Sequence, residues 1–95
     1  MATLITPSGT LKVVQPKNGS TVFTAAEIHD LIEGYLECVY LSDGRLMWIN
    51  EDGKRQGLAP NMVATFVALN RLQRGDVIVG NAVITTRSEA GEEEL

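Results

Sequence analysis

The chain has 95 residues, of which 44% are hydrophobic, and it carries a formal net charge of −4 at pH 7. This length gives one domain with a modest core that favours self-association, so we expect a homo-oligomer. The single cysteine, Cys38, excludes an intramolecular disulfide and a thiolate zinc site within one chain. The sequence has no secretory signal pattern and no apolar run of about 18 residues, so we expect a cytoplasmic protein with no membrane segment.

The negative charge is concentrated near the C-terminus. Residues 88–95 hold four glutamates and no apolar periodicity, which predicts an acidic, disordered tail after a single domain over residues 1–87. Without those four carboxylates the formal charge changes from −4 to 0. A neutral body lacks the basic field that attracts nucleic acids, so nucleic-acid binding is disfavoured.

The N-terminal part of the chain predicts a β-hairpin followed by a short helix. Residues 3–6 and 11–15 are β-prone, and the Pro-Ser-Gly sequence between them is typical of a turn. Farther along, Thr24 can accept a hydrogen bond as a helix cap, and Glu27 three residues later completes a capping box. Gly34 stands where a left-handed residue would end this helix.

A second hairpin is predicted in the middle of the chain. Residues 35–41 and 45–50 are rich in β-branched and aromatic residues, and Asp43 and Gly44 supply the positive φ angles of a tight turn. Apolar side chains alternate onto both faces of these strands. We therefore expect this hairpin to lie centrally in a sheet or to contact a second copy of the chain.

The C-terminal half predicts a second helix and a last strand. The helix begins at Pro60, with Asn61 as its cap, and its large apolar residues are expected to face the core. These residues are Met62, Val63, Phe66, Val67 and Leu69. Residues 76–85 predict a strand that Gly80 and Asn81 interrupt with a bulge or turn. The elements together predict an α+β fold, with a small, mostly antiparallel sheet of about five strands and two helices in a single domain.

Several short motifs follow one another in a recognisable order: Gly34-Tyr35-Leu36-Glu37, Asp43-Gly44, Asn50-Glu51-Asp52-Gly53-Lys54, Gly57-Leu58, Asn61, Ala64-Thr65 and Asp76-Val77-Ile78-Val79-Gly80. With these motifs, residues 3–86 resemble domain-of-unknown-function family 3846, found largely in bacteriophages and bacteria. The resemblance is strongest over residues 50–61, and the chain departs from the family pattern at Ala59, where a proline would directly follow the Gly-Leu pair. It implies a bacteriophage protein in the host cytoplasm with a small α+β fold, and no established activity.

No arrangement of catalytic or metal-binding residues stands out. His29 is the only histidine, and it lies on the predicted first helix away from any serine or cysteine at a nucleophile-motif spacing. Glu51 and Asp52 fit a turn better than an acid–base pair, and the loop around them lacks the ligand spacing of a calcium site. We therefore expect no enzyme activity, no metal and no cofactor.

The candidate ligand-binding residues lie between positions 48 and 65. They are Trp48, Asn50, Lys54, Arg55, Gln56, Gly57, Asn61 and Thr65. Lys54, Arg55 and the amides near Gly57 precede a helix N-terminus, where an anion is favoured. The alternative is a well-capped connection without a ligand. Trp48 can stack on a base, or it can be an ordinary residue of the sheet core.

Two functions from different classes remain open. The first hypothesis is a non-enzymatic bacteriophage accessory protein that binds a small anionic or nucleotide-like ligand and sequesters a host defence signal. The alternative is a host-protein-binding inhibitor or interaction module that acts through the apolar hairpin face or the acidic tail. A third, weaker option is a virion or housekeeping domain whose oligomer is itself the function.

Overall fold

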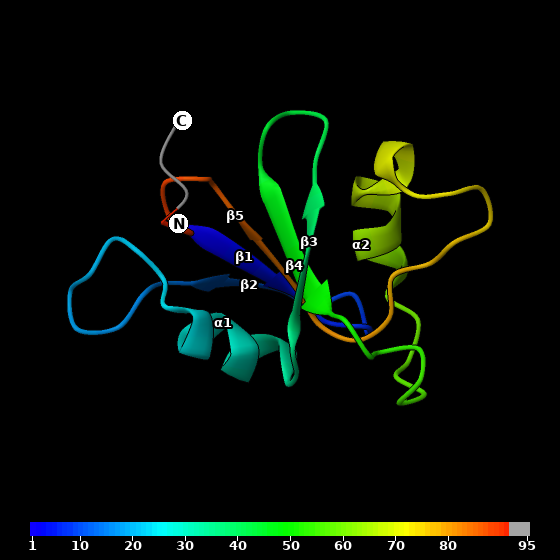
Figure 1. Cartoon of the computed structure of the whole chain (residues 1–95), viewed down its shortest axis with the longest axis horizontal. Coiled ribbons are helices and arrows are strands. Elements are labelled where there is room, and N and C mark those ends of the chain that lie inside the picture. Colours follow the sequence, from blue (N-terminus) through cyan, green and yellow to red (C-terminus); the bar gives the residue numbers. More distant parts are fainter. Residues whose placement is uncertain (92–95) are drawn as a thin grey trace.

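The computed structural model of the chain describes residues 1–91. Five strands form one antiparallel sheet in the order β2-β1-β5-β4-β3, and two helices pack on its opposite faces (Figure 1). The elements in chain order are β1 (Ala2–Ile5), β2 (Leu11–Val14), α1 (Ala25–Ile32), β3 (Leu36–Tyr40), β4 (Leu46–Asn50), α2 (Met62–Val67), the 3-10 helix η1 (Leu69–Arg71) and β5 (Ala82–Thr85). The predicted α+β class is confirmed.

Both predicted hairpins form. β1 pairs with β2, β3 pairs with β4, and the β3–β4 turn uses one residue of positive φ, Gly44 at 91°. Asp43 plays a different role from the predicted one, because its carboxylate accepts a hydrogen bond from the Arg45 backbone N–H at 3.0 Å. β4 lies inside the sheet but β3 forms its edge, so the expectation of a central hairpin is right for only one of its strands.

β5 joins the two hairpins into one sheet, because it pairs with both β1 and β4. It is shorter than the strand predicted over residues 76–85. Gly80 has a φ of 77°, which breaks the strand, and Val79 before it makes only an isolated bridge with Pro60. All four residues of β5 are buried. β5 therefore occupies the centre of the sheet.

The two faces of the sheet carry separate apolar cores. On the α1 face the buried residues are Ala2, Phe23, Ile28, Ile32 and Val83. On the α2 face they are Ile5, Leu41, Met47, Ala64, Ala68, Ile78, Ala82 and Ile84. Because side chains alternate between the faces of a strand, β1 and β5 contribute to both cores and hold the two layers together.

α1 begins at the predicted capping box. The Glu27 backbone N–H donates to the Thr24 hydroxyl at 3.1 Å, and the Thr24 N–H donates to Glu27 Oε1 at 2.8 Å. The second carboxylate oxygen of Glu27 accepts the Lys17 N–H at 2.8 Å. These backbone donors, Thr24 first and Lys17 second, lower the pKa of Glu27. The cap therefore also anchors the loop that leads into the helix.

The C-terminal end of α1 differs from the prediction. Glu33, with a φ of 63°, is the left-handed residue, so the role predicted for Gly34 is wrong. Gly34 is required for another reason. A Cβ atom at this position would stand 2.6 Å from Asn50 Cγ, closer than two carbon atoms can approach. The missing side chain lets the backbone after α1 lie directly against Asn50.

The described residues of the predicted acidic tail contact the body. Residues 87–91 form a turn, in which the Glu89 carbonyl accepts the Phe23 N–H at 2.7 Å. The Glu89 carboxylate pairs with the N-terminal ammonium group of Met1 at 2.5 Å. Residues 92–95 of the predicted tail lie outside the described residues.

We expect Gly34→Ala to lower the free energy of unfolding by roughly 1–3 kcal/mol, because the added methyl overlaps the buried Asn50 side chain. Glu33→Gly is the matched control, and it should raise stability by roughly 0.5–1 kcal/mol because it relieves a left-handed conformation. Urea denaturation followed by circular dichroism measures both changes. An unchanged midpoint for Gly34→Ala would contradict the close contact.

Candidate functional site

The segment that the sequence singles out begins with Asn50 at the end of β4. Its side chain is buried, with 4% of the residue exposed. Asn50 Nδ2 donates to the Glu33 carbonyl at 3.3 Å and to Gln56 Oε1 at 3.1 Å, and Oδ1 accepts the Asp52 N–H at 2.8 Å. Asn50 therefore joins the end of α1 to the loop after β4. Its hydrogen-bonding groups are used within the chain.

The loop after Asn50 is held by contacts between its own residues. Arg55 pairs with Asp52, and the Gln56 N–H donates to the Asp52 carbonyl at 2.9 Å. Gly57 has a φ of 72°, a conformation that favours glycine, so the loop can turn back there. Arg55 is the most exposed cation of the ion pairs, with 81% of its side chain in solvent.

Asn61 is completely buried and connects three parts of the fold. Its Nδ2 donates to the Ile5 carbonyl at 3.0 Å and to the Gly80 carbonyl at 2.8 Å. Its Oδ1 accepts the Ala64 N–H at 3.1 Å, which confirms Asn61 as the cap of α2. The amide thus binds β1, the entry to β5 and the helix N-terminus together.

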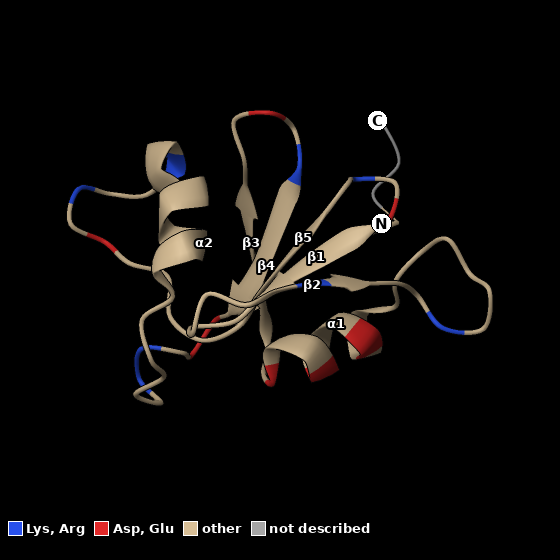
Figure 2. Ribbon diagram, turned by 180° about the vertical axis from the view of Figure 1, so that it is seen from behind, with Lys and Arg blue, Asp and Glu red and all other residues tan. Residues whose placement is uncertain are grey.

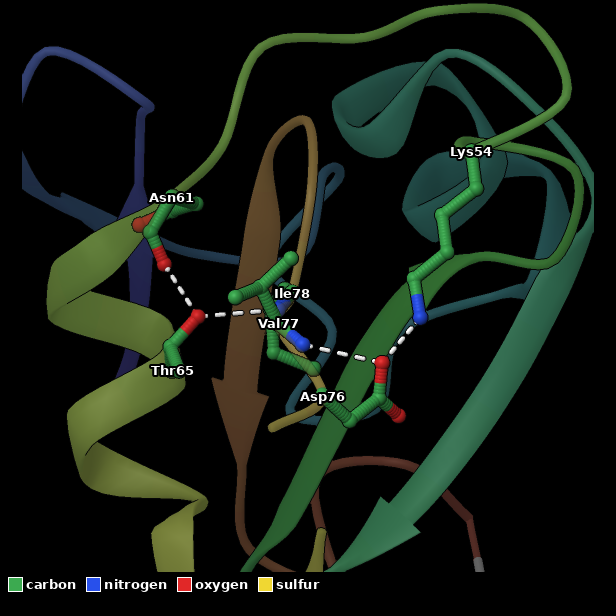
Figure 3. Close-up of polar contacts among 6 residues, drawn as sticks. All are labelled: Lys54, Asn61, Thr65, Asp76, Val77 and Ile78. Atoms are coloured by element: carbon green, nitrogen blue, oxygen red, sulfur yellow. Dashed lines mark hydrogen bonds and ion pairs between the residues drawn. The ribbon is translucent and has the colours of Figure 1, made fainter. Parts of the chain in front are cut away.

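Thr65 lies one turn after Asn61 on the same side of α2. Its hydroxyl donates to the Asn61 carbonyl and accepts the Ile78 N–H, both at 2.8 Å. The residue is 5% exposed. Figure 3 shows the segment around Ile78 held between the α2 side chains and Lys54. Asn61 and Thr65 therefore serve the packing of α2 against the chain before β5.

Lys54 reaches the same segment from the other side and pairs with Asp76 (Figure 3). Asp76 Oδ1 also accepts the Val77 N–H at 2.9 Å. The hydrogen bond from Lys54, followed by that from Val77, lowers the pKa of Asp76. The carboxylate therefore stays ionised and holds residues 76–78 against the loop after β4.

A hollow of about 150 Å³ lies beside the Lys54–Asp76 pair, between β3, β4 and residues 76–79. Its other charged lining residues are Glu37 and Glu51, so three carboxylates face one ammonium group. Of the predicted ligand-binding residues, only Asn50 and Lys54 line it.

Trp48 lies away from the hollow beside Lys54 and Asp76. It lies on the α1 face, where its Nε1–H donates to the Thr85 hydroxyl at 3.0 Å, and it packs against the core under α1. The structure therefore does not gather the eight predicted residues into one cavity. Ligand binding by them stays a prediction.

The large apolar side chains of α2 and η1 point into solvent, so the prediction that they face the core is wrong. Met62 is 59% exposed, Val63 38%, Phe66 78%, Val67 38% and Leu69 55%. We call these five residues the α2 apolar face. The core side of the helix instead carries Asn61, Ala64, Thr65 and Ala68. The spacing of these small and polar residues, i, i+3, i+4 and i+7, is the signal that could have revealed the orientation.

The described residues give no sign of a metal centre or of a membrane helix. Within residues 1–91, no group of three or more His, Cys, Asp or Glu side chains could hold a metal ion. In the same range no helix is both long and apolar enough to cross a membrane. His29 lies on the surface of α1, 3.8 Å from the carboxylate of Asp30.

These features define a small α+β protein with an antiparallel sheet between two helices and an apolar helix face open to solvent. The chain belongs to the family described as domain of unknown function DUF3846, whose model matches residues 1–95. This match confirms the resemblance seen in the sequence. No curated protein and no solved structure matches the chain.

We expect Asn61→Ala to lower the free energy of unfolding by roughly 2–4 kcal/mol, because two buried carbonyls lose their donor and α2 loses its cap. Asn70→Ala is the control, since Asn70 is exposed and its side chain makes no hydrogen bond in the described part of the chain. Urea denaturation measures both variants. A loss below about 0.5 kcal/mol for Asn61→Ala would refute the structural role of this amide.

Because the pKa of Asp76 is lowered in the folded chain, its contribution to stability is present above its unfolded pKa, about 3.9, and is lost as the pH falls through the folded value. Asp76→Asn should therefore be less stable than the wild type near pH 7, and the difference should shrink below about pH 4. Glu51→Gln is the control, because the Glu51 carboxylate lines the same hollow without a hydrogen bond or ion pair within residues 1–91. Thermal unfolding from pH 7 to pH 2.5 tests this, and a pH-independent difference would count against it.

Proposed function

We propose that the chain is a non-enzymatic interaction module that binds a host protein through the α2 apolar face. The observation that carries this proposal is the exposure of Phe66, 78%, between the exposed residues Met62 of α2 and Leu69 of η1. These three residues follow the spacing i, i+4 and i+7, which is the pattern of anchors when a helix docks into an apolar groove. Contiguous apolar patches on a small soluble domain mark sites of interaction.

The orientation of α2 supports the proposal because the helix cannot roll to bury Phe66. Rolling would pull the Asn61 amide from the Ile5 and Gly80 carbonyls and the Thr65 hydroxyl from the Ile78 N–H. Each buried polar group left without a partner costs about 1–3 kcal/mol. The small side chains on the core side leave no room for larger ones. The polar contacts of Asn61 and Thr65 therefore hold the α2 apolar face in solvent.

Charges around the helix indicate what the partner surface carries. Arg71 ends η1 and Arg74 lies in the loop after it, and within residues 1–91 neither forms an ion pair. Figure 2 shows basic positions at the end of this helical segment and, together with one acidic position, in the following loop, whereas the carboxylates of α1 lie on the other side of the sheet. A partner with an apolar groove bordered by carboxylates would complement both features.

Binding of a small anionic or nucleotide-like ligand has less support as the function of this protein. The hollow beside Lys54 is the feature that such a ligand would use, but Glu37, Glu51 and Asp76 give it a negative field. The ammonium group of Lys54 is already paired with Asp76. The bacteriophage setting of the proposed host partner rests on the family resemblance alone.

A photoreactive residue at position 66 should cross-link one defined protein in a bacterial host lysate, and the same residue at position 35 serves as control. Tyr35 is 69% exposed but lies away from α2. With the captured protein purified, Phe66→Ala should weaken binding about 30-fold, the effect of a central anchor worth about 2 kcal/mol. Stability should change by less than about 0.5 kcal/mol, since the side chain is exposed in the free chain.

Two outcomes would remove this proposal. Equal cross-linking from positions 35 and 66 would mean that contact with α2 is not specific. Unchanged affinity for Phe66→Ala and Leu69→Ala would place the binding surface elsewhere. Isothermal titration calorimetry with the purified partner measures the affinities.

A further inference from the structure

β2 is an edge strand of the sheet and pairs only with β1 among the strands of residues 1–91 (Figure 2). The hydrogen bond from the Thr6 N–H to the Thr10 carbonyl, 3.0 Å, together with the β1–β2 register, determines which residues of β2 bond to β1. By this alternation the N–H and C=O groups of Leu11 and Val13 point away from the sheet. Within residues 1–91 they make no hydrogen bond.

The side chains of the same two residues are also exposed. Leu11 is 61% and Val13 59% exposed, on the face of the sheet that carries α2. An edge strand with apolar side chains and unpaired backbone groups is a template for another strand. We infer that β2 pairs antiparallel with β2 of a second copy, about a two-fold axis perpendicular to the sheet. The two sheets then become one continuous sheet.

Charge and backbone geometry select one register for this pairing. With Lys12 opposite its own counterpart, two ammonium groups would repel. With Leu11 opposite its counterpart, Val13 would face Gly9, whose φ of 91° belongs to the turn. With Val13 opposite its counterpart, Leu11 faces Gln15 of the second copy, and each of these pairs exchanges two hydrogen bonds.

The selected register also places Lys12 near carboxylates of the second copy. Lys12 then lies opposite Val14 of the second copy, on the α1 face. Val14 lines a hollow of about 230 Å³ whose charged lining residues are Lys17, Glu27 and Asp30, so two carboxylates face one ammonium group. Asp30 is the exposed carboxylate of the two. Within residues 1–91 Lys12 forms no ion pair. Its apolar stem covers the hollow and its ammonium group meets the Asp30 carboxylate.

Disulfide trapping in the full-length chain tests the register. Paired Val13 residues have Cα atoms about 5.5 Å apart, within the range of a disulfide, so Val13→Cys should cross-link two chains under mild oxidation. Leu11→Cys is the matched control. Its two copies lie about 14 Å apart in this register and should not cross-link. The wild type, with Cys38 alone, reports any background.

Sedimentation equilibrium up to millimolar concentration should give a mass of twice the 10.3 kDa of the chain. Lys12→Glu and Asp30→Lys should each weaken the dimer about fivefold, and the double variant should restore it. A monomeric mass at every concentration, or equal cross-linking of the two cysteine variants, overturns the inference. Phe66 is not part of β2, so Phe66→Ala should leave dimerisation unchanged and failure of one proposal leaves the other standing.

Discussion

The buried side-chain amide of Asn61 determines how the second half of the chain packs. It bonds to carbonyls of Ile5 and Gly80 and caps α2 with its oxygen, so three separate parts of the fold meet at one group. A buried amide is stable only when its hydrogen bonds are made. The hydrogen bonds of Asn61 therefore fix the position of the α2 N-terminus on the sheet. Thr65 sets the rotation of the helix through its bond to the Ile78 N–H. The large side chains of α2 point outward as a consequence of these two polar contacts.

In the middle of the chain, several polar side chains are buried and several large apolar side chains are exposed. Polar residues that suggest a binding site, Asn50 and Asn61 above all, lie inside and bond to the backbone. Apolar residues that suggest a core, Phe66 above all, lie outside. The ion pair between Lys54 and Asp76 attaches residues 76–78 to the loop after β4, on the side away from α2. The outer side of α2 therefore offers apolar surface, whereas the polar groups of Asn50 and Asn61 are used inside the fold.

Local chemistry made much of the fold predictable. The capping box of Thr24 and Glu27 and the turn at Gly44 depend on neighbours in sequence, and both are found where expected. The orientation of α2 was harder to predict, because hydrophobic periodicity favours burial of the large apolar side chains that are in fact exposed, and the contact that opposes it joins Asn61 to Ile5, 56 residues away. The same limit applies to the candidate site. From the sequence, a polar side chain such as Asn61 looks available for a ligand, because its distant hydrogen-bond partner within the fold is not visible there.

The central position of β5 governs how the chain can fold as it leaves the ribosome. The β1–β2 and β3–β4 hairpins are local and can form early in synthesis. The sheet, however, cannot close until Ala82–Thr85 has emerged to pair with both β1 and β4. Until then the nascent chain exposes two inner strand edges, which are the surfaces that chaperones and aggregation compete for. Pairing of β5 with both β1 and β4 is therefore the step that completes the sheet.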